Sequence, residues 1–370
     1  MRSLPKNILR LLSPSDGVFQ TGFAVFRRAM ETGASWSGFR DLLDAVAAPK
    51  WARYPLGCLI TFAQAQSWFP ETGLEFEIDS NVPQSFGVSS SAALEIATLR
   101  ALETFSGRGL VGTQIAHLGQ DAENHFVGAP CGLMDQLASA FGKPRHLLPI
   151  LCRPDRLLPL IPLPPGVRVV GWPSGVKHAV TGSPYSIARA ATFMGKRIAE
   201  RRSGNSWSCA AEIPLSRFRS GIESLLPEQM RGTEFTREYG STDDPLTTVD
   251  ASITYPVRAA LRFAVEENAR CEQAIHLFSD APGRPDNLAM IGELLYRSHA
   301  GYSSIGLGCP ETDGIVRALQ SAGTAAGIFG ARVSGGGSGG TVIVLIEDDA
   351  VTTLHRLQHS KDLPALLLID

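Results

Sequence analysis

The run Pro83-Gln84-Ser85-Phe86-Gly87-Val88-Ser89-Ser90-Ser91-Ala92-Ala93 is the most informative part of this 370-residue sequence. It comes shortly after Leu74-Glu75-Phe76-Glu77-Ile78, where apolar and polar residues alternate as in a strand with one solvated face. Beyond Ser91 the apolar residues recur at helical spacing, at Ala92, Ala93, Ile96, Leu99 and Leu102. Glu95 falls in the first turn of this helix, where the helix dipole favours an acid. The sequence therefore predicts a strand, a serine-rich loop and a helix.

The serine-rich loop could hold phosphate groups. Backbone N–H groups at the start of a helix have no partner within it and carry partial positive charge, so they attract anions. A serine hydroxyl at this place can also bind Mg²⁺. The alternative is an ordinary serine cap without a ligand, which is common at helix starts. The candidate phosphate-binding residues are Gly87, Ser89, Ser90, Ser91 and Ala92.

A second run, Gly128-Ala129-Pro130-Cys131-Gly132-Leu133-Met134-Asp135-Gln136, places one carboxylate in a segment bounded by glycine and proline. Asp135 could accept the proton of a substrate hydroxyl, or it could merely cap the helix that follows. Glu123, just before this run, is either a Mg²⁺ ligand or a solvated helix charge. Together with Ser91 it would form a set of hard oxygen donors, which suits Mg²⁺ and not zinc.

The third run, Ser334-Gly335-Gly336-Gly337-Ser338-Gly339-Gly340, lies between two apolar strands predicted over 331–333 and 341–346. Its glycines would let the backbone approach a ligand closely. The run also matches the patterns G-x-G-x-x-G and G-x-S-x-G, but both of these require a helix after the loop, where this sequence predicts a strand. A hydrolase using Ser338 would also need a histidine and an acid near the loop. A flexible linker is disfavoured by the flanking strands.

In this order, the three runs resemble those of the GHMP small-molecule kinases, a superfamily that contains galactokinase, homoserine kinase, mevalonate kinase and phosphomevalonate kinase. Glu123-Asn124-His125-Phe126-Val127-Gly128 looks like galactokinases. The span 51–346 is similar to the L-arabinokinase branch, and the short segments with similar sequence are 174–178, 191–195, 292–296 and 306–308.

The resemblance implies an α/β (α+β) kinase of two domains with the active cleft between them. The first would be a mixed sheet with helices, like domain 2 of ribosomal protein S5, and the second a ferredoxin-like domain. The implied reaction is ATP- and Mg²⁺-dependent phosphorylation of the anomeric hydroxyl of a free sugar, arabinose- or galactose-like. The implied residues are Gly87, Ser89, Ser90, Ser91, Ala92, Gly335, Gly336 and Gly337 for the nucleotide, Ser91 and Glu123 for the metal, and Asp135 for the sugar hydroxyl. Tyr185 is a further candidate for the sugar pocket, although a tyrosine before a helix commonly belongs to the core.

The sequence departs from the family's pattern at its start. Kinases of this family begin with a segment resembling G-R-x-N-x-I-G-E-H-x-D-Y, which supplies an arginine near the transferred phosphoryl group, and residues 1–50 contain no such run. Loss of that positive charge typically costs orders of magnitude in rate. Lys177, Arg189 or Arg262 could substitute for it. The first domain is also expected to lack its first strands and to expose a sheet edge.

Three single positions also differ, because Ser85, Pro173 and Phe263 stand where the family usually has glycine, aspartate and histidine. Such changes fit an altered sugar, an impaired site or a sequence that continues upstream. Two interpretations therefore stay open. The chain is a working sugar-1-kinase, or it is a kinase-derived binding or regulatory protein that keeps the nucleotide loops without turnover.

Composition predicts an ordinary globular protein, with 44% hydrophobic and 19% charged residues. The formal net charge is −2 and no long basic run occurs, so we expect neither nucleic acid nor a membrane as partner, and a monomer or weak homodimer. The six cysteines show neither zinc-site spacing nor the density of a disulfide scaffold. No stretch approaches the length of a membrane span. We therefore expect a cytoplasmic protein.

The proline-rich stretch 158–166 predicts a domain boundary, which gives domains at 1–165 and 166–370. Helical periodicity predicts further helices at about 113–124, after Cys131, and at 185–201, 257–277 and 286–299. A strand is expected over 167–172, and a polar loop over 202–208.

Overall fold

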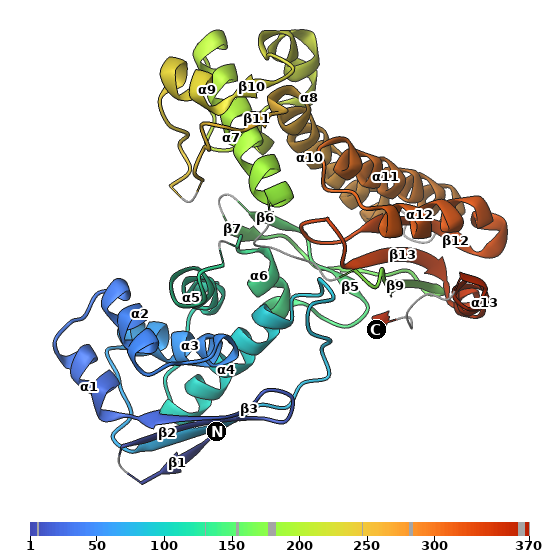
Figure 1. Ribbon diagram of the computed structural model, residues 1–370. Helices are drawn as coiled ribbons and strands as arrows, with labels where there is room; N and C mark the ends of the chain where they lie inside the picture. Colours follow the sequence, from blue (N-terminus) through green and yellow to red (C-terminus); the bar gives the residue numbers. More distant parts are fainter. Residues whose placement is uncertain are drawn as a thin grey trace. The chain divides into compact units, whose positions relative to one another are not determined.

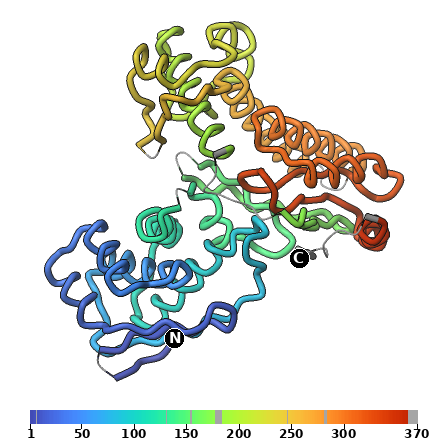
Figure 2. The backbone as a smooth tube through the Cα atoms, viewed as in Figure 1, coloured from blue at the N-terminus to red at the C-terminus, as the bar shows by residue number. Residues whose placement is uncertain are grey.

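The computed structural model describes residues 1–5, 7–129, 131–152, 155–176, 183–245, 247–280, 284–361 and 367–369. The chain forms two compact units, and its path can be followed in Figures 1 and 2. Unit 1 comprises residues 1–84, 89–142 and 150–158, and unit 2 comprises residues 85–88, 143–149 and 159–370. The serine-rich run is therefore divided between the units, with its first half in unit 2 and its second half in unit 1.

A four-stranded sheet begins unit 1. Its order is β1-β4-β2-β3, with β2 parallel to β4 and the other pairs antiparallel. Leu9 and Leu11 of β2 are buried while the residues between them are partly exposed, so this strand directs alternate side chains into the core. The four strands are β1 (Arg2–Leu4), β2 (Ile8–Ser13), β3 (Gly17–Gly22) and β4 (Gly73–Glu77).

This sheet corrects one expectation from the sequence. Residues 1–50 were expected to contribute no early strands, yet residues 2–22 supply three of the four strands. The expected exposed edge is present nevertheless, because β1 and β3 each pair with one neighbour among the described residues. β4 itself was predicted correctly, shifted by one residue.

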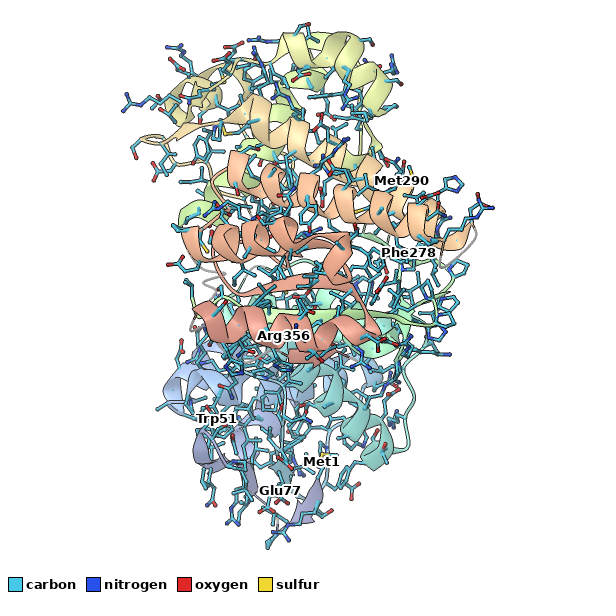
Figure 3. The ribbon with its side chains drawn as sticks, turned by 90° about the vertical axis from the view of Figure 1, so that its right-hand side faces the viewer. Met1, Trp51, Glu77, Phe278, Met290 and Arg356 are labelled. Carbon is cyan, nitrogen blue, oxygen red and sulfur yellow. The ribbon has the colours of Figure 1, made fainter. Side chains whose placement is uncertain are left out.

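The helices of unit 1 pack around α3, which is buried along most of its length. A methyl group on Gly57 of α3 would lie 3.0 Å from Cβ of Ala122, so α3 and α5 approach closely at this glycine. Trp51, labelled in Figure 3, packs at the start of α3 against the main core of this unit. The helices are α1 (Ala24–Glu31), α2 (Trp36–Ala45), α3 (Lys50–Gln66), α4 (Ser90–Ser106), α5 (Gln114–Ala122), a π-helical turn η1 (Glu123–Val127) and α6 (Met134–Phe141), followed by the hairpin β6 (Ile150–Cys152) and β7 (Asp155–Leu157).

Unit 2 contains an antiparallel sheet of order β12-β13-β9-β14. In chain order these strands occupy positions 2-3-1-4, which is the ferredoxin-like arrangement expected for the second domain. α11 lies very close to β12, since a methyl group on Gly330 would lie 2.4 Å from Cα of Gly292. The strands are β9 (Val167–Pro173), β12 (Ile328–Val333), β13 (Thr341–Glu347) and β14 (Leu367–Ile369).

Helices cover this sheet and continue into a separate helical layer with its own core, which includes Met194, Phe218 and Phe235. The longer helices of unit 2 are α7 (Ser183–Ser203), α9 (Gly232–Tyr239), α10 (Val257–Ser279), α11 (Pro285–Ser304), α12 (Pro310–Ala322) and α13 (Val351–Lys361). Its shorter elements are α8 (Leu215–Arg217), the strand pairs β5 (His146–Leu147) with β8 (Ile161–Pro162) and β10 (Met230–Arg231) with β11 (Thr254–Tyr255), and the turns η2 (Ala210–Glu212), η3 (Phe218–Ile222), η4 (Glu223–Leu225), η5 (Thr324–Ala326) and η6 (Asp348–Ala350).

The helices and strands predicted by periodicity are present, with ends that differ by a few residues. The helix expected over 113–124 ends at Ala122 and continues as a π-helical turn until Gly128, whose φ is +79°. The polar loop expected from residue 202 begins after Ser203. Within the described part of the chain, none of the helices has the length and apolar character needed to cross a membrane.

Candidate active site

The first turn of α4 presents backbone N–H groups without a side-chain cap. Ser89 is the N-cap residue, but its φ of +58° is left-handed and its side chain makes no capping hydrogen bond. The helix is 17 residues long, so its aligned peptide dipoles give the N-terminus a partial positive charge. The N–H groups of Ser90, Ser91 and Ala92 are therefore available to an anion such as a phosphate. An ordinary serine cap, the alternative reading of this run, is not what the structure contains.

Next to this turn, unit 1 buries a cluster of two carboxylates and one amide. Nε2 of Gln136 donates to Oε2 of Glu123 and to Oε2 of Glu95, at 3.0 Å each. The Ser91 hydroxyl and the Cys131 thiol are near enough to the Glu123 carboxylate to stabilise its charged form. Glu123 is therefore not the solvated helix charge that the sequence left open, since it is 7% exposed and hydrogen bonded to Gln136.

Burial governs the protonation of this cluster. It raises the pKa of Glu95 well above the ordinary value, and the neighbouring Glu123 raises it further. Burial also raises the pKa of Glu123, while Cys131 and Ser91 oppose that change. A cation near Glu123 would relieve the unfavourable burial of its negative charge. The burial of this cluster is therefore compensated either by a proton on a carboxylate or by a bound cation.

Ser91 and Glu123 fit a hard cation through a hydroxyl and a carboxylate oxygen. The buried atoms Glu95 Oε1 and Gln136 Oε1 have no hydrogen-bond partner among the described residues. Buried polar atoms are usually hydrogen bonded, so these two oxygens could accept a hydrogen bond from a bound water or ligand. Across those same residues, no group of three or more His, Cys, Asp or Glu is arranged to hold a metal ion. Mg²⁺ bound here would therefore take its other oxygens from water and from a phosphate.

Asp135 lies on the first turn of α6, half-buried and one residue before Gln136. Its charge acts on both Glu95 and Glu123, where it raises their pKa values. Leu133 is the N-cap of α6, so Asp135 is not the cap residue that the alternative interpretation assumed. The structure thus brings Ser91, Glu123 and Asp135 together in unit 1.

The glycine loop joins β12 to β13 in unit 2 and holds the first half of the serine-rich run. The Ser334 hydroxyl donates to the Gly87 carbonyl at 3.3 Å, and the Thr341 hydroxyl donates to the Phe86 carbonyl at 2.7 Å. Gly335 and Gly337 have φ values of +63° and +78°, a conformation that glycine adopts without strain. Two runs that lie about 250 residues apart are therefore hydrogen bonded to each other.

The hydrolase interpretation of this loop finds no support. The segment after it is strand β13 and not a helix. The Oγ atom of Ser338 is buried and has no hydrogen-bond partner in the described part of the chain, so neither a histidine nor an acid activates it there.

The remaining candidates lie elsewhere in unit 2. Tyr185 packs, half-buried, in a small apolar cluster with Ile305 and Leu307. Arg189 is ion-paired with Asp244 at 2.6 Å, and Arg262 is ion-paired with Glu223. Lys177 lies outside the described residues, as do His178 and Pro130.

Departures from the expected pattern have visible local effects. Ser85 has a left-handed φ of +64°, a conformation that favours the glycine usual at this place. Phe263 packs its ring edge against Tyr302, at 5.1 Å between ring centroids. Pro173 is the last residue of β9 and pairs with Thr341.

Two residues of the cluster were not identified from the sequence. Glu95 was expected as a first-turn acid stabilised by the helix dipole, but α4 begins at Ser90 and has no acid in its first turn. Glu95 lies beyond that turn, fully buried and hydrogen bonded to Gln136. Gln136 was read only as part of the second run. The signal that could have found Glu95 is its place four residues after Ser91, which puts both side chains on one face of α4.

Comparison with known proteins places this chain in a family. A model described as the N-terminal domain of GHMP kinases matches residues 53–143, and one described as the C-terminal domain matches residues 284–360. Galactokinase from Roseiflexus sp. is 32% identical over 308 residues, which cover 83% of this chain and 68% of the galactokinase. Galactokinase from Pasteurella multocida is 30% identical over 331 residues, with coverages of 87% and 74%.

L-arabinokinase from Arabidopsis thaliana is 32% identical over 346 residues, which cover 84% of this chain. The chain spans about a third of that relative's length, 33%. Among solved structures, galactokinase from Lactococcus lactis complexed with galactose has a TM-score of 0.75 at 21% identity, covering 99% of this chain and 83% of its own. A mevalonate kinase has a TM-score of 0.56 at 14% identity, with coverages of 100% and 88%. These two structures share the fold of this chain.

Proposed function

Because this chain belongs to the galactokinase-like branch of the GHMP kinases, we propose that it transfers a phosphoryl group from ATP to the anomeric hydroxyl of a free monosaccharide, arabinose- or galactose-like. One observation carries the proposal: the buried side chains of Glu95, Glu123 and Gln136 form a hydrogen-bonded cluster, and both Ser91 and Asp135 are close enough to Glu123 to influence its pKa. The product would be the sugar 1-phosphate.

The nucleotide would be held by backbone groups. The uncapped N–H groups of Ser90, Ser91 and Ala92 suit the oxygens of a phosphate chain, and Ser89 precedes them in a left-handed conformation. Gly87 leads into this turn, and its carbonyl is fixed by Ser334 beside Gly335, Gly336 and Gly337. ATP would supply the transferred phosphoryl group, and Mg²⁺ held by Ser91 and Glu123 would offset its negative charge.

Asp135 would act on the sugar. As the anomeric oxygen attacks phosphorus, the proton of the anomeric hydroxyl becomes more acidic and needs an acceptor. A half-buried carboxylate at the start of a helix can orient that hydroxyl and receive the proton. Glu123 and Asp135 would then have different tasks, with the more buried carboxylate next to the metal and the more accessible one next to the sugar. Tyr185 remains a candidate for contact with the sugar ring.

The test is ADP release with Mg²⁺ and ATP, measured against a panel of pentoses, hexoses and uronic acids. We expect one sugar or a few to stimulate release well above background. In Asp135→Asn, the stimulated rate should fall by roughly 100- to 10,000-fold, because the proton acceptor is lost. The Kd for ATP, measured by calorimetry, should change by less than about twofold, because the phosphate-binding N–H groups are retained.

Asp41→Asn is the matched control, since Asp41 lies exposed on α2 of the same unit. It should match the wild type in both rate and ATP affinity. Equal loss of ATP affinity in Asp135→Asn would contradict the role given to Asp135.

A second candidate is a kinase-derived protein that binds ATP and a sugar without turnover. It is supported by the pairing of Arg189 with Asp244 and of Arg262 with Glu223, because a paired guanidinium is less available to a transferring phosphoryl group. ATP binding without ADP release for every sugar in the panel would favour this candidate. Absence of ATP binding would overturn both.

A further inference from the structure

Tyr302 contacts the glycine loop from the last turn of α11. Its hydroxyl donates a hydrogen bond of 2.7 Å to the carbonyl of Gly335. Gly335 is also near Gly87, since a methyl group on it would lie 3.8 Å from the Gly87 carbonyl oxygen. One side-chain hydroxyl therefore holds the loop at the residue that faces the phosphate-binding run.

The loop also lies tightly on the ring of Tyr302. A methyl group on Gly337 would lie 2.9 Å from Cδ1 of Tyr302 and 2.5 Å from the carbonyl oxygen of Leu307. The next residue donates its backbone N–H to that same carbonyl, Ser338 to Leu307 at 2.7 Å. Only glycine fits here, so the ring and the Leu307 carbonyl together determine the path of the loop.

The ring is itself held from two sides. The Arg332 guanidinium carbon lies 5.1 Å from its centroid, in the range of a cation–π contact, and Phe263 packs edge-on against it. Arg332 is in turn ion-paired with Glu267 at 2.9 Å. The tyrosine thus has little freedom to move away from the loop.

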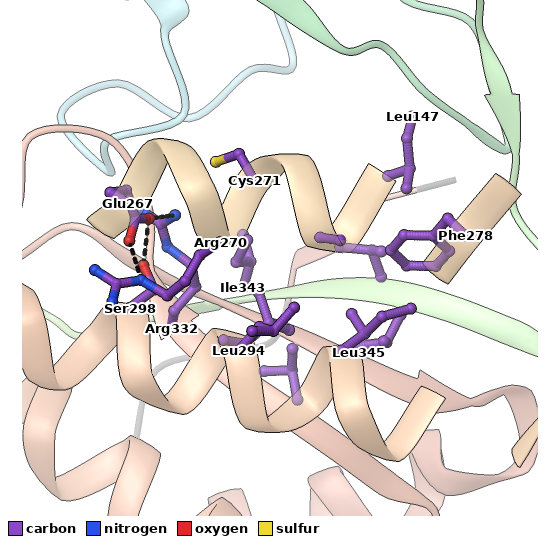
Figure 4. Close-up of a pocket in the computed structure, with 15 residues that line it drawn as sticks. Leu147, Glu267, Arg270, Cys271, Phe278, Leu294, Ser298, Arg332, Ile343 and Leu345 are labelled. Carbon is purple, nitrogen blue, oxygen red and sulfur yellow. Dashed lines mark hydrogen bonds and ion pairs between the residues drawn. The ribbon is translucent and has the colours of Figure 1, made fainter. Parts of the chain in front are cut away.

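Glu267 links α10, α11 and β12. Its carboxylate accepts from Arg332, from Arg270 at 2.8 Å and from the Ser298 hydroxyl at 2.5 Å, as the dashed lines in Figure 4 show. These four side chains form the polar end of a pocket of about 160 Å³ whose other walls are mainly apolar. The support of Tyr302 therefore extends from the loop into the packed interior of unit 2.

We propose that Tyr302 is a positioning residue for ATP. Its hydroxyl would hold the glycine loop in the conformation that binds the nucleotide, and Ser334 of that loop would in turn hold the Gly87 carbonyl. This inference rests on the proposed function. The hydroxyl does not touch the reacting atoms, so its loss should weaken nucleotide binding and leave sugar binding unaffected. The Phe263 and Arg332 contacts to the ring would remain in a phenylalanine variant.

The test compares Tyr302→Phe with Tyr296→Phe. Tyr296 lies on the same helix, and its buried hydroxyl has no hydrogen-bond partner among the described residues. Removal of that hydroxyl should therefore leave the affinity for ATP unchanged. For Tyr302→Phe we expect the Kd and KM for Mg-ATP to rise about fivefold, as for the loss of one hydrogen bond. The KM for the sugar that the panel identifies, and Tm without ligand, should stay close to those of the wild type.

The outcomes separate this inference from the proposed function. If the wild type binds ATP and Tyr302→Phe matches Tyr296→Phe in ATP affinity, the positioning role is wrong. If Tyr302→Phe lowers Tm and raises both KM values together, the hydroxyl has a general structural role and the inference is also wrong. If the wild type does not bind ATP, the proposed function fails and the positioning role fails with it.

Discussion

His299 is a buried titratable residue of α11 beside the strand that enters the glycine loop. Its Nδ1 accepts the backbone N–H of Val333 at 3.3 Å, and its Nε2 lies 3.0 Å from a carboxylate oxygen of Asp313. Burial lowers the pKa of His299, and Asp313 only partly opposes that effect. The accepting Nδ1 requires the neutral ring with its proton on Nε2. The fold is therefore built around the uncharged imidazole.

This arrangement predicts a pH dependence of stability with a definite sign. Because the folded pKa lies below the ordinary value of 6.5, the stabilisation by neutral His299 is complete above that pH and is lost as pH falls through the folded value. Urea unfolding of the wild type and of His299→Gln should therefore differ most at neutral pH. The difference should shrink on acidification by up to about 1.4 kcal/mol per pH unit. Parallel stability curves from pH 7.5 to 5 would contradict this.

The residues of the active-site cluster also show what a sequence can and cannot reveal at this scale. Ser91, Glu123 and Asp135 were identified because their residue types lie in runs with a recognisable chemistry. Glu95 and Gln136 were not, because their importance comes from burial next to Glu123, and burial of a polar side chain is decided by tertiary packing. An acid on the first turns of a helix has an adequate local explanation, and that explanation concealed its role.

At the scale of elements, the turn before α4 contains backbone strain, because a residue other than glycine adopts a left-handed conformation there. Ser85 adopts a φ of +64°, in which a side chain meets the backbone unfavourably. Ser85→Gly should raise the free energy of unfolding by about 0.5 to 1 kcal/mol, after the larger entropy of glycine in the unfolded chain is subtracted. Denaturant unfolding measures this. Ser85 is exposed, so no packing is lost.

A matched control for this variant is Ser186→Gly. Ser186 is exposed on helix α7, where glycine costs about 0.5 kcal/mol relative to serine. The two variants should therefore change stability in opposite directions. A loss of stability in both would show that the left-handed turn is not strained.

Long amphipathic helices were predictable as elements, whereas the first strands were not. α10 and α11 extend over 20 residues or more and repeat their apolar residues at helical spacing, so their existence was plain from the sequence. β1 has three residues and β2 six, too few for alternation to stand out from neighbouring segments. β2 pairs with the adjacent β3, but β1 and β2 also both pair with β4, which lies about 65 to 75 residues later. Contacts of that range leave no local signal.

At the scale of the whole molecule, β3 is an edge strand of the sheet of unit 1. β3 pairs with β2 on one side, and no described strand pairs with it on the other. Val18 on this strand is 68% exposed, while Phe19 beside it is buried. An edge strand with an exposed valine can pair with the same strand of a second copy. This is the physical basis for expecting a weak homodimer in equilibrium with the monomer.

A lysine on the edge strand should weaken that pairing. Val18→Lys adds a charge that must remain solvated, so pairing of a second strand with β3 becomes unfavourable. The monomer should tolerate the lysine, because position 18 is exposed to solvent. Sedimentation velocity over a range of concentrations should show a shift toward dimer for the wild type and none for Val18→Lys. Val25→Lys is the control, because Val25 is 43% exposed but lies on helix α1, which offers no strand edge. A wild type that stays monomeric at the highest concentration, or an equal effect of both lysines, would exclude pairing through β3.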